Sequence, residues 1–397
     1  MADKKRVIIV GAGFGGVKVA LDLDKFRDSF QTILINETSY HCYHADLYEL
    51  AAVILKHEKK LDFENVASTV NIPLSKIFKD KKTEIVIGRV ETIDPNQRIV
   101  KTQNKSFEYD FLIIATGSET NYFNIEGARE YSHPFKNTAD ALNIHNDLEE
   151  LSSSKTDLLQ VVIVGAGFTG VELAGELRRF LPRSCQIRLI EGSKQVLTGM
   201  PTWAQELAFK RLKSLGIELS FSQSVKKVES DKLICQNGEE FKFDYLIWTA
   251  GVVGSKPANN LAGFKFTKRN QLEVKKDLSL KQFPQIFVVG DMVEFWDEKR
   301  ASFVPPTAWV ALSQADVVSK NIYLSLNNQN TLKFIPPSPG FVVPIGSHFA
   351  ISNLFNLQIT GFSGWVLKRL IAFKYLVSIL PFKEALAIWW RGLTIYT

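Results

Sequence analysis

Two glycine-rich segments of the chain have the residue types and spacing that could bind a dinucleotide. The first is Val7-Ile-Ile-Val-Gly11-Ala-Gly13-Phe-Gly-Gly16, and the second is Val161-Val-Ile-Val-Gly165-Ala-Gly167-Phe-Thr-Gly170. In such a loop the first glycine permits a tight turn, the second lets the backbone approach a pyrophosphate, and the third lets helix and strand pack closely. The N-terminus of the following helix then stabilises the phosphate charge. Each segment therefore favours a dinucleotide site over a simple packing turn.

An acidic residue follows each loop at the same distance, Glu37 in the first copy and Glu191 in the second. A carboxylate in this position can accept hydrogen bonds from the hydroxyls of a ribose. At Glu191 it would also disfavour a 2′-phosphate, so we expect NADH to be preferred over NADPH there. The alternative for both residues is a solvated charge at a strand end.

These motifs require a buried strand before each loop, a helix after it and a second strand before the acidic residue, which is the βαβ unit of a dinucleotide-binding domain. The repeat continues, because Phe107–Gly117 matches Phe241–Gly251. The ends of these segments add Thr116, Gly117 and Gly251 as candidate cofactor contacts. A late apolar run leading to Gly290 and Asp291 has no counterpart, so we expect it to complete the first sheet and to place Asp291 at a ligand-binding edge.

The composition is that of a globular protein with two or three domains: 397 residues, 45% hydrophobic and 23% charged. The net charge of +6 includes no dense basic block, so no nucleic-acid partner is expected. Three scattered cysteines are too few for a disulfide framework and favour a reducing compartment. Because His41, His44 and His57 have no partners at ligand spacing, no metal site is expected.

The segment 326–397 differs in composition from the rest. It begins with a loop rich in Asn and Pro and ends in an apolar, basic tail, in which Gly364–Thr397 has a net charge of +4. The longest uncharged run there, Tyr375–Phe382, is far shorter than the roughly 18–20 residues that span a bilayer. The tail therefore predicts an amphipathic region that lies on a membrane surface, with docking on the protein itself or on a second subunit as the alternative.

Taken together, the motifs resemble the type II NADH dehydrogenases, the non-pumping NADH:quinone oxidoreductases of the two-dinucleotide-binding flavoprotein superfamily. The resemblance covers nearly the whole chain and rests on Gly165–Glu172, Gly251-Val-Val-Gly254-Ser255, Gly290-Asp291, Pro305-Pro-Thr-Ala308 and the tail. It implies an α/β fold with two Rossmann-like domains, one for FAD and one for NADH, and a membrane-associating C-terminal region. The implied boundaries are 1–118 and 265–325 for the FAD domain, 119–264 for the inserted NADH domain, and 326–397 for the C-terminal region.

The resemblance also implies an activity. The nicotinamide of NADH would give hydride to a non-covalently bound FAD, and a membrane quinone would receive two electrons without proton pumping. The enzyme would be a peripheral protein on the cytoplasmic face of the cell membrane, with residues 364–397 on the lipid surface. The resemblance does not determine the oligomeric state, and a homodimer is one of the alternatives.

The resemblance assigns roles to residues of this chain. It implies that Glu172 lies near the contact of flavin and nicotinamide, and acts in nicotinamide positioning or proton handling. Asp291 would contact the ribityl chain, Ala308 would contact FAD, and Lys368 would lie near the flavin edge or the bilayer.

Near the expected quinone site the chain departs from the family pattern. Trp309 and Ser313 stand where glutamines are usual, and Gln314 remains as a candidate quinone partner. Trp309 could stack on a quinone or flavin ring, or fill the core.

Cys42 supports a rival interpretation as a soluble flavin NADH oxidase or peroxidase, since related enzymes place a redox cysteine just beyond the second strand of the FAD domain. It has no Cys-x4-Cys partner, and its surroundings fit the quinone reductases better. A redox-sensing flavoprotein with slow turnover is the alternative from another class.

Overall fold

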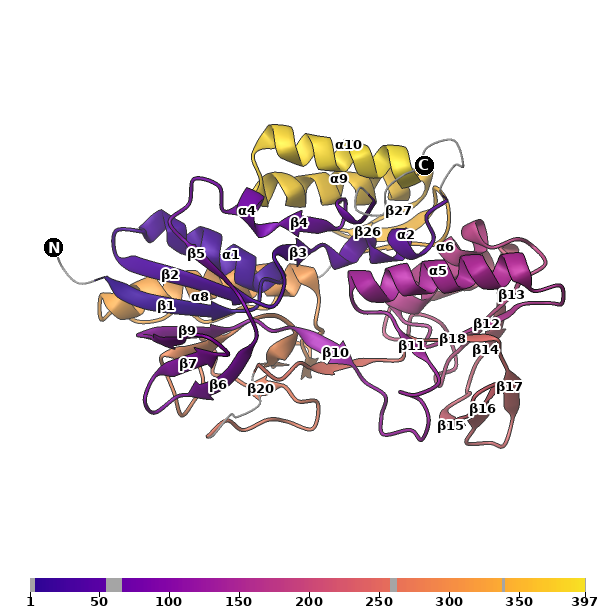
Figure 1. Ribbon diagram of the computed structural model, residues 1–397, viewed down its shortest axis with the longest axis horizontal. Coiled ribbons are helices and arrows are strands. Elements are labelled where there is room, and N and C mark those ends of the chain that lie inside the picture. Colours follow the sequence, from indigo (N-terminus) through magenta and orange to yellow (C-terminus); the bar gives the residue numbers. More distant parts are fainter. Residues whose placement is uncertain (1–3, 55–65, 258–262, 338–339, 397) are drawn as a thin grey trace. The chain divides into compact units, whose positions relative to one another are not determined.

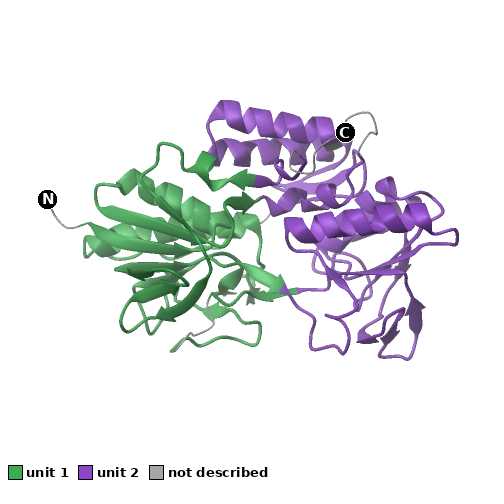
Figure 2. Ribbon diagram, viewed as in Figure 1, with its two compact units in different colours: residues 1–42, 72–119, 252–339 green, residues 43–71, 120–251, 340–397 purple. Residues whose placement is uncertain are grey.

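The computed structural model describes residues 4–54, 66–257, 263–337 and 340–396, and we restrict the structural description to these (Figure 1). His57 lies outside them. The chain divides into two compact units, each built from three segments (Figure 2). Unit 1 comprises Met1–Cys42, Ile72–Glu119 and Val252–Pro339, and unit 2 comprises Tyr43–Asn71, Thr120–Gly251 and Gly340–Thr397.

Unit 1 is built on a parallel sheet with the strand order β21-β9-β1-β2-β5. Its strands are Ile286–Val288 (β21), Phe111–Ile114 (β9), Lys5–Val10 (β1), Phe30–Asn36 (β2) and Glu84–Ile87 (β5). The central strand β1 buries Val7 to Val10 almost completely, as a strand covered on both faces must. The pairing of β21 with β9 confirms that the late strand returns to complete the first sheet.

Helices α1 (Phe14–Leu23) and α8 (Ala308–Leu326) pack against each other in unit 1. Thr307 caps α8, because its hydroxyl accepts a hydrogen bond from the Val310 N–H. An antiparallel sheet of β6, β7 and β8 follows β5, at Val90–Asp94, Ile99–Thr102 and Ser106–Glu108. The short elements are β3 (Tyr40–Cys42), β4 (Asn71–Pro73), α4 (Leu74–Ile77), β10 (Ser118–Thr120), β19 (Val252–Gly254), β20 (Leu272–Glu273), β22 (Val293–Glu294), β23 (Trp296–Asp297), β24 (Ser302–Phe303) and 3-10 turns at Asp24–Phe26 and Gly290–Met292.

Unit 2 repeats the architecture with a parallel sheet in the order β11-β18-β12-β13-β14. Its strands are His133–Pro134 (β11), Tyr245–Trp248 (β18), Gln160–Val164 (β12), Gln186–Ile190 (β13) and Glu218–Ser220 (β14). The other elements of this half are α2 (Leu47–Ala51, after a 3-10 turn at His44–Asp46), α5 (Thr138–Ser154), α6 (Phe168–Phe180), α7 (Thr202–Ser214) and an antiparallel sheet of β15 (Val225–Val228), β16 (Lys232–Cys235) and β17 (Glu240–Lys242). Two parallel Rossmann-like sheets confirm the predicted α/β class.

The C-terminal residues form a third layer of unit 2. An antiparallel sheet of β25 (Phe341–Pro344), β26 (Ala350–Leu354) and β27 (Leu357–Gly361) packs against helix α9 (Phe362–Ile379), and α10 (Phe382–Tyr396) lies alongside α9 (Figure 1). Gly364 permits this close packing, because a Cβ there would lie 2.5 Å from the carbonyl oxygen of Ala350.

The compact units divide the chain differently from the predicted domains in several places. Residues 252–264 and 326–339 belong to unit 1 and not to the predicted NADH domain and C-terminal region. Residues 43–71, which follow β3, belong to unit 2, and so do residues 340–397. The tail is therefore a structural part of unit 2, and one side of α9 packs on the protein itself. The buried positions of α9 are Gly364, Lys368, Arg369, Ala372, Tyr375, Leu376 and Ile379.

Candidate functional site

The two glycine loops have the same backbone geometry. Gly11 and Gly165 have φ angles of +103° and +104°, in the region that favours glycine. A Cβ on Gly16 or Gly170 would lie 1.9 Å from the carbonyl oxygen of Gly11 or Gly165, respectively. These four positions therefore need glycine for the fold itself.

The central glycine of each loop differs from its neighbours. A Cβ on Gly13 would have no neighbour nearer than 3.9 Å, and one on Gly167 would have none within 4 Å. Packing within the protein does not require glycine at these two positions. A pyrophosphate that lies close to the loop backbone would require it, because a side chain would occupy the same space. Gly13 and Gly167 also begin helices α1 and α6 with no side-chain cap. The loops thus fit two dinucleotides.

The ends of the second strands correct one detail of the repeat. Val10 pairs with Ile35 in unit 1 and Val164 pairs with Ile190 in unit 2, so the structural counterpart of Glu191 is Asn36 and not Glu37. The matching by a constant sequence offset is wrong here, because the connection between loop and strand is one residue longer in unit 2.

Hydrogen bonds support the same correspondence. The Asn36 side-chain oxygen accepts from the Ala12 N–H at 2.8 Å, and a Glu191 oxygen accepts from the Ala166 N–H at 2.7 Å. The other Glu191 oxygen accepts from the Ser193 N–H. Glu37 lies one residue further on and is largely exposed.

Unit 1 contains a cavity of about 250 Å³ beside its glycine loop. Glu37, Arg89 and Thr116 line it, with Val10, Gly11, Ile35, Asn36, Thr38, Gly88, Val90, Ser255, Lys256 and Pro257. The Thr116 hydroxyl donates to the Ser255 carbonyl at 2.8 Å, and the Ser255 N–H donates to the Gly117 carbonyl. Thr116 and Gly117 thereby fix the wall of this cavity.

Asp291 is held in position at the turn after β21. Its carboxylate accepts from the Ser118 hydroxyl at 2.5 Å, and Gly290 before it has a φ of +75°. The side-chain oxygen of Gln314, which is only 1% exposed, accepts from the Gly290 N–H at 2.7 Å. Gln314 therefore supports this turn, which its position in the sequence did not reveal.

Trp309 and Ala308 begin helix α8, directly after the Thr307 cap. The Trp309 side chain is half exposed, at 52%. Filling of the core therefore does not explain this residue.

Glu172 lies in the second turn of α6. Burial raises the pKa of its carboxyl group to about 8, while the positive charge of Lys368 opposes this shift. One turn further on, burial raises the pKa of Glu176 to about 7 against the opposing charge of Arg179. At neutral pH Glu172 is therefore largely protonated.

Lys368 belongs to a buried ion cluster in unit 2. Its ammonium donates to Asp46 at 2.6 Å and to Glu49 at 3.0 Å, and Arg369 donates to Glu49 at 3.0 Å. Burial alone would raise the pKa of Glu49, but Arg369 and Lys368 lower it to about 2. The structure thus brings the predicted residues Glu172 and Lys368 into one electrostatic neighbourhood and adds Asp46 and Glu49, which the sequence did not single out.

In unit 2, Gly251 follows β18 beside the glycine loop. Its carbonyl accepts from the Asn121 N–H, and a Cβ there would lie 2.9 Å from the Phe123 ring. On the other side of β12, Glu191 follows β13. The predicted residues Gly165, Gly167, Gly170, Glu191 and Gly251 therefore lie around one sheet edge of unit 2.

A family model for pyridine nucleotide-disulphide oxidoreductases matches residues 5–315, well over half of the chain. The chain belongs to this family. Among curated relatives, type II NADH:quinone oxidoreductases from Staphylococcus haemolyticus and Staphylococcus aureus are 28% identical over 391 residues, covering 93% of this chain and 94% of each relative.

Solved structures show the same fold for this family member. NDH2 from Plasmodium falciparum in complex with NADH matches with a TM-score of 0.84 and 18% identity, over 99% of this chain and 98% of that one. The sulfide:quinone oxidoreductase from Aquifex aeolicus matches with a TM-score of 0.78 and 20% identity, over 94% and 91%.

All three cysteines of the chain are thiols. Cys42 is half-buried at the end of β3, and Cys185 and Cys235 are buried in unit 2. The described residues contain no group of three or more His, Cys, Asp or Glu side chains that could hold a metal ion.

Proposed function

We propose that this family member is an FAD-dependent NADH:quinone oxidoreductase that does not pump protons. The observation that carries the proposal is the duplicated loop, in which Gly13 and Gly167 each face space that no protein atom fills. A chain with two such loops can bind two dinucleotides, one at each loop. Relatives of that name, similar along 93% of the chain, support the assignment of NADH as donor and quinone as acceptor.

Unit 1 would hold FAD non-covalently. Gly11, Gly13 and Gly16 would shape the loop for the pyrophosphate, and Thr116, Gly117 and Ala308 would contact the cofactor beside it. Asp291, fixed by Ser118, would accept hydrogen bonds from the ribityl hydroxyls. Bound FAD supplies the two-electron chemistry that links a hydride donor to a quinone.

Unit 2 would hold NADH on the second loop. Glu191 presents a carboxylate that would accept from the ribose hydroxyls and repel a 2′-phosphate, so we expect NADH to be the better substrate. Since its oxygens already accept from Ala166 and Ser193, the carboxylate is fixed in direction before the nucleotide arrives.

Reduction of a quinone to a quinol takes up two electrons and two protons, and NADH supplies two electrons and one proton. The remaining proton must come through the protein or from solvent. Glu172 can hold such a proton on its carboxyl group near neutral pH, because burial raises its pKa to about 8. Lys368 would tune this proton affinity through its positive charge. Trp309 would contact the quinone ring.

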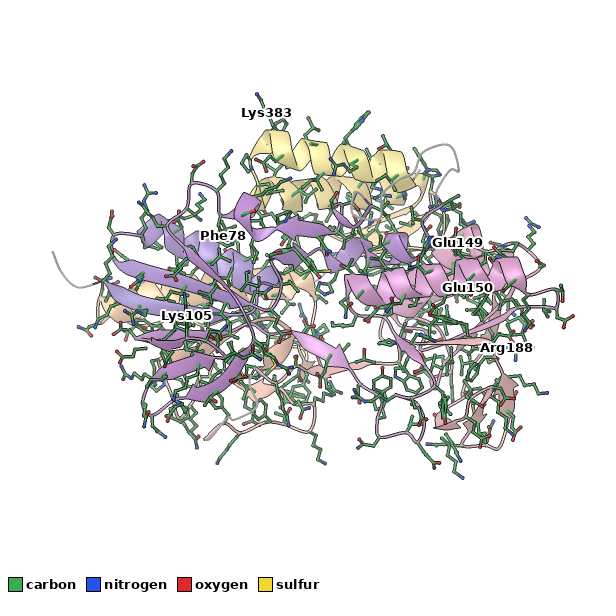
Figure 3. The ribbon with its side chains drawn as sticks, in the orientation of Figure 1. Phe78, Lys105, Glu149, Glu150, Arg188 and Lys383 are labelled. Atoms are coloured by element: carbon green, nitrogen blue, oxygen red, sulfur yellow. The ribbon has the colours of Figure 1, made fainter. Side chains whose placement is uncertain are left out.

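The enzyme would act at the cytoplasmic face of the cell membrane as a peripheral protein. In the described part of the chain, no helix has both the length and the apolar character that crossing a bilayer requires. Helix α10 instead exposes Phe382, Leu386 and Trp390 along one side. Lys383, at its beginning, extends away from the ribbon (Figure 3). Apolar side chains with basic neighbours suit a lipid surface.

The test of the proposal is steady-state NADH oxidation by the purified protein with quinone, oxygen, peroxide or ferricyanide offered separately. We expect a yellow protein that reduces a quinone far faster than oxygen or peroxide. Cys42→Ser should keep most of this activity. Loss of nearly all activity in Cys42→Ser, together with rapid peroxide reduction by the wild type, would establish the soluble oxidase or peroxidase instead. A wild type that is folded, colourless and unable to take up FAD would overturn the proposal.

A further inference from the structure

A tight turn of unit 2 places an aromatic residue in a backbone conformation that aromatic residues rarely adopt. The Ile125 N–H donates to the Tyr122 carbonyl at 2.9 Å, and the two residues between them, Phe123 and Asn124, have φ angles of +53° and +55°. Two left-handed central residues are the pattern of a type I′ turn, in which Gly, Asn and Asp dominate. Asn124 fits this pattern, whereas the bulk of Phe123 makes a positive φ unfavourable.

Asn121 fixes this turn to the sheet of unit 2. Its N–H donates to the Gly251 carbonyl at 3.0 Å, and its carbonyl accepts from the Trp248 indole N–H at 2.8 Å. Its side-chain oxygen accepts from the Phe123 N–H at 2.8 Å. These bonds hold Phe123 in its unfavourable conformation. None of them involves the ring of Phe123, so the turn itself does not require an aromatic residue.

The Phe123 side chain contributes little to the core of unit 2. It is 54% exposed, although its neighbour Tyr122 packs on the buried Trp248 with ring centroids 5.9 Å apart. The Phe123 ring lies instead against Gly251, where a Cβ would stand 2.9 Å from the ring atom Cζ. A strained backbone that presents a half-exposed aromatic side chain points to a ligand contact, because the fold gains little from it.

The order of the strands indicates which part of a dinucleotide would meet this ring. Strand β12, which leads into the glycine loop, lies between β13 and β18. With the pyrophosphate at this loop, the adenosine would lie on the side of β13, where Glu191 follows the strand, and the nicotinamide half on the side of β18. Gly251 follows β18, and Ala250 before it lies 2.7 Å from where a Cβ on Gly165 would stand. The Phe123 ring is therefore on the nicotinamide side of the loop.

We propose that Phe123 recognises the nicotinamide half of the dinucleotide in unit 2, by packing its ring on that half. The flat, apolar surface of the ring suits the planar nicotinamide. Because Asn121 fixes the turn, the ring is in place before the nucleotide binds, and binding orders little of the protein. This inference rests on the proposed binding of NADH in unit 2.

The experiment measures by calorimetry the Kd of the oxidised flavoprotein for two nucleotides. NAD⁺ has the nicotinamide half and cannot reduce the flavin, whereas ADP has only the adenosine and pyrophosphate part. We expect Phe123→Ala to raise the Kd for NAD⁺ by about fivefold or more and to leave the Kd for ADP unchanged. Phe123→Tyr keeps the ring and should bind both nucleotides as the wild type does. Leu158→Ala is the matched control and should also bind both normally, since Leu158 is an equally exposed apolar residue that precedes β12, at the opposite end of this strand from the loop.

Phe123→Gly separates a ligand contact from a role in folding. Glycine adopts a positive φ without strain, so this variant should resist denaturant better than Phe123→Ala. Its Kd for NAD⁺ should nevertheless rise as much as in Phe123→Ala, because both variants lack the ring. The proposal is overturned by NAD⁺ affinity that recovers together with stability in Phe123→Gly, by equal weakening for ADP and NAD⁺, or by wild-type NAD⁺ affinity in Phe123→Ala. If the wild type binds neither nucleotide, the proposed NADH site itself fails.

Discussion

The Gln314 side chain accepts a hydrogen bond from the Gly290 N–H at 2.7 Å, from inside helix α8 to the turn after the last strand of the unit 1 sheet. This bond joins two segments that were both predicted to contact cofactor or substrate. It makes Gln314 a support of the turn that carries Asp291.

Replacing Gln314 should therefore disturb the flavin site before the quinone site. Gln314→Leu leaves the Gly290 N–H without its acceptor, at a cost of about 1–3 kcal/mol. We expect lower flavin content and parallel losses in the quinone and ferricyanide rates. Gln314→Glu keeps an acceptor oxygen and should retain most of both. A raised quinone KM with normal flavin content would instead make Gln314 a direct quinone partner.

Trp309→Gln should disturb the quinone site and leave the flavin site intact. Because the side chain is 52% exposed, its replacement should change the free energy of unfolding by no more than about 0.5 kcal/mol. If the ring stacks on quinone, the quinone KM should rise severalfold while the rate of ferricyanide reduction by NADH stays close to that of the wild type. Equal effects on both acceptors would place the ring at the flavin.

The central glycines allow a matched pair of variants. Neither Gly13 nor Gly167 has a protein atom close to where a Cβ would stand, so valine at either position should leave the fold intact. Gly13→Val should lose the visible flavin absorbance. Gly167→Val should remain yellow and show a KM for NADH raised at least tenfold. Flavin retained in Gly13→Val would argue against a pyrophosphate at the first loop.

Glu172 predicts a pH-dependent stability. In the folded protein the pKa of this carboxyl is raised to about 8, whereas in the unfolded chain it has the ordinary pKa of 4.5. Between these values the unfolded state binds fewer protons, so the residue lowers the stability as the pH rises. Glu172→Gln cannot ionise, and its advantage over the wild type should grow from pH 4.5 to 8 and then level off.

The size of that advantage is limited by solvent. Each unit by which the pKa is raised corresponds to about 1.4 kcal/mol. Water at the partly exposed side chain reduces the total, so we expect the free energy of unfolding of Glu172→Gln to exceed that of the wild type by about 1–3 kcal/mol at pH 9. Denaturant unfolding of the flavin-loaded protein at several pH values measures it. A constant difference across pH would show that Glu172 has an ordinary pKa. In stopped flow, Glu172→Ala should keep the flavin spectrum and slow its reduction by NADH.

The membrane role is best tested on helix α10. Deleting the whole tail would remove Lys368 and Arg369 and leave Asp46 and Glu49 buried without their cations, which is strongly destabilising. Replacing Phe382, Leu386 and Trp390 by serine avoids this, because all three are exposed.

Burial of these three side chains in lipid would supply several kcal/mol, at about 2 kcal/mol each. The triple variant should therefore stop floating with anionic vesicles while keeping its ferricyanide activity. Leu158→Ser, an equally apolar exposed site before β12, should float as the wild type does. Flotation of the triple variant at the wild-type level would exclude this face of α10 as the lipid contact.

Sequence reasoning could predict whatever depends on local pattern. The loops, strands and late return to the first sheet follow from apolar runs punctuated by glycine, and these features are local. That Glu191 is the structural equivalent of Asn36 depends on one extra residue between the glycine loop and the second strand of unit 2. A match at constant sequence offset does not reveal this extra residue. The partnership of Lys368 with Asp46 and Glu49 joins residues some 320 positions apart. No period or spacing in the sequence encodes such a contact, and only the packing of unit 2 reveals it.

The composition of unit 2 from early and late segments bears on how the protein is made. A ribosome adds about 5–20 residues per second, so the 322 positions between Asp46 and Lys368 correspond to roughly 16–64 s of synthesis. Throughout that time Asp46 and Glu49 lack the cations of helix α9 that neutralise them in the folded protein. Unit 2 therefore cannot complete its charged interior until helix α9 has been synthesised, and the surface that α9 covers is open to chaperones or to misassociation until then.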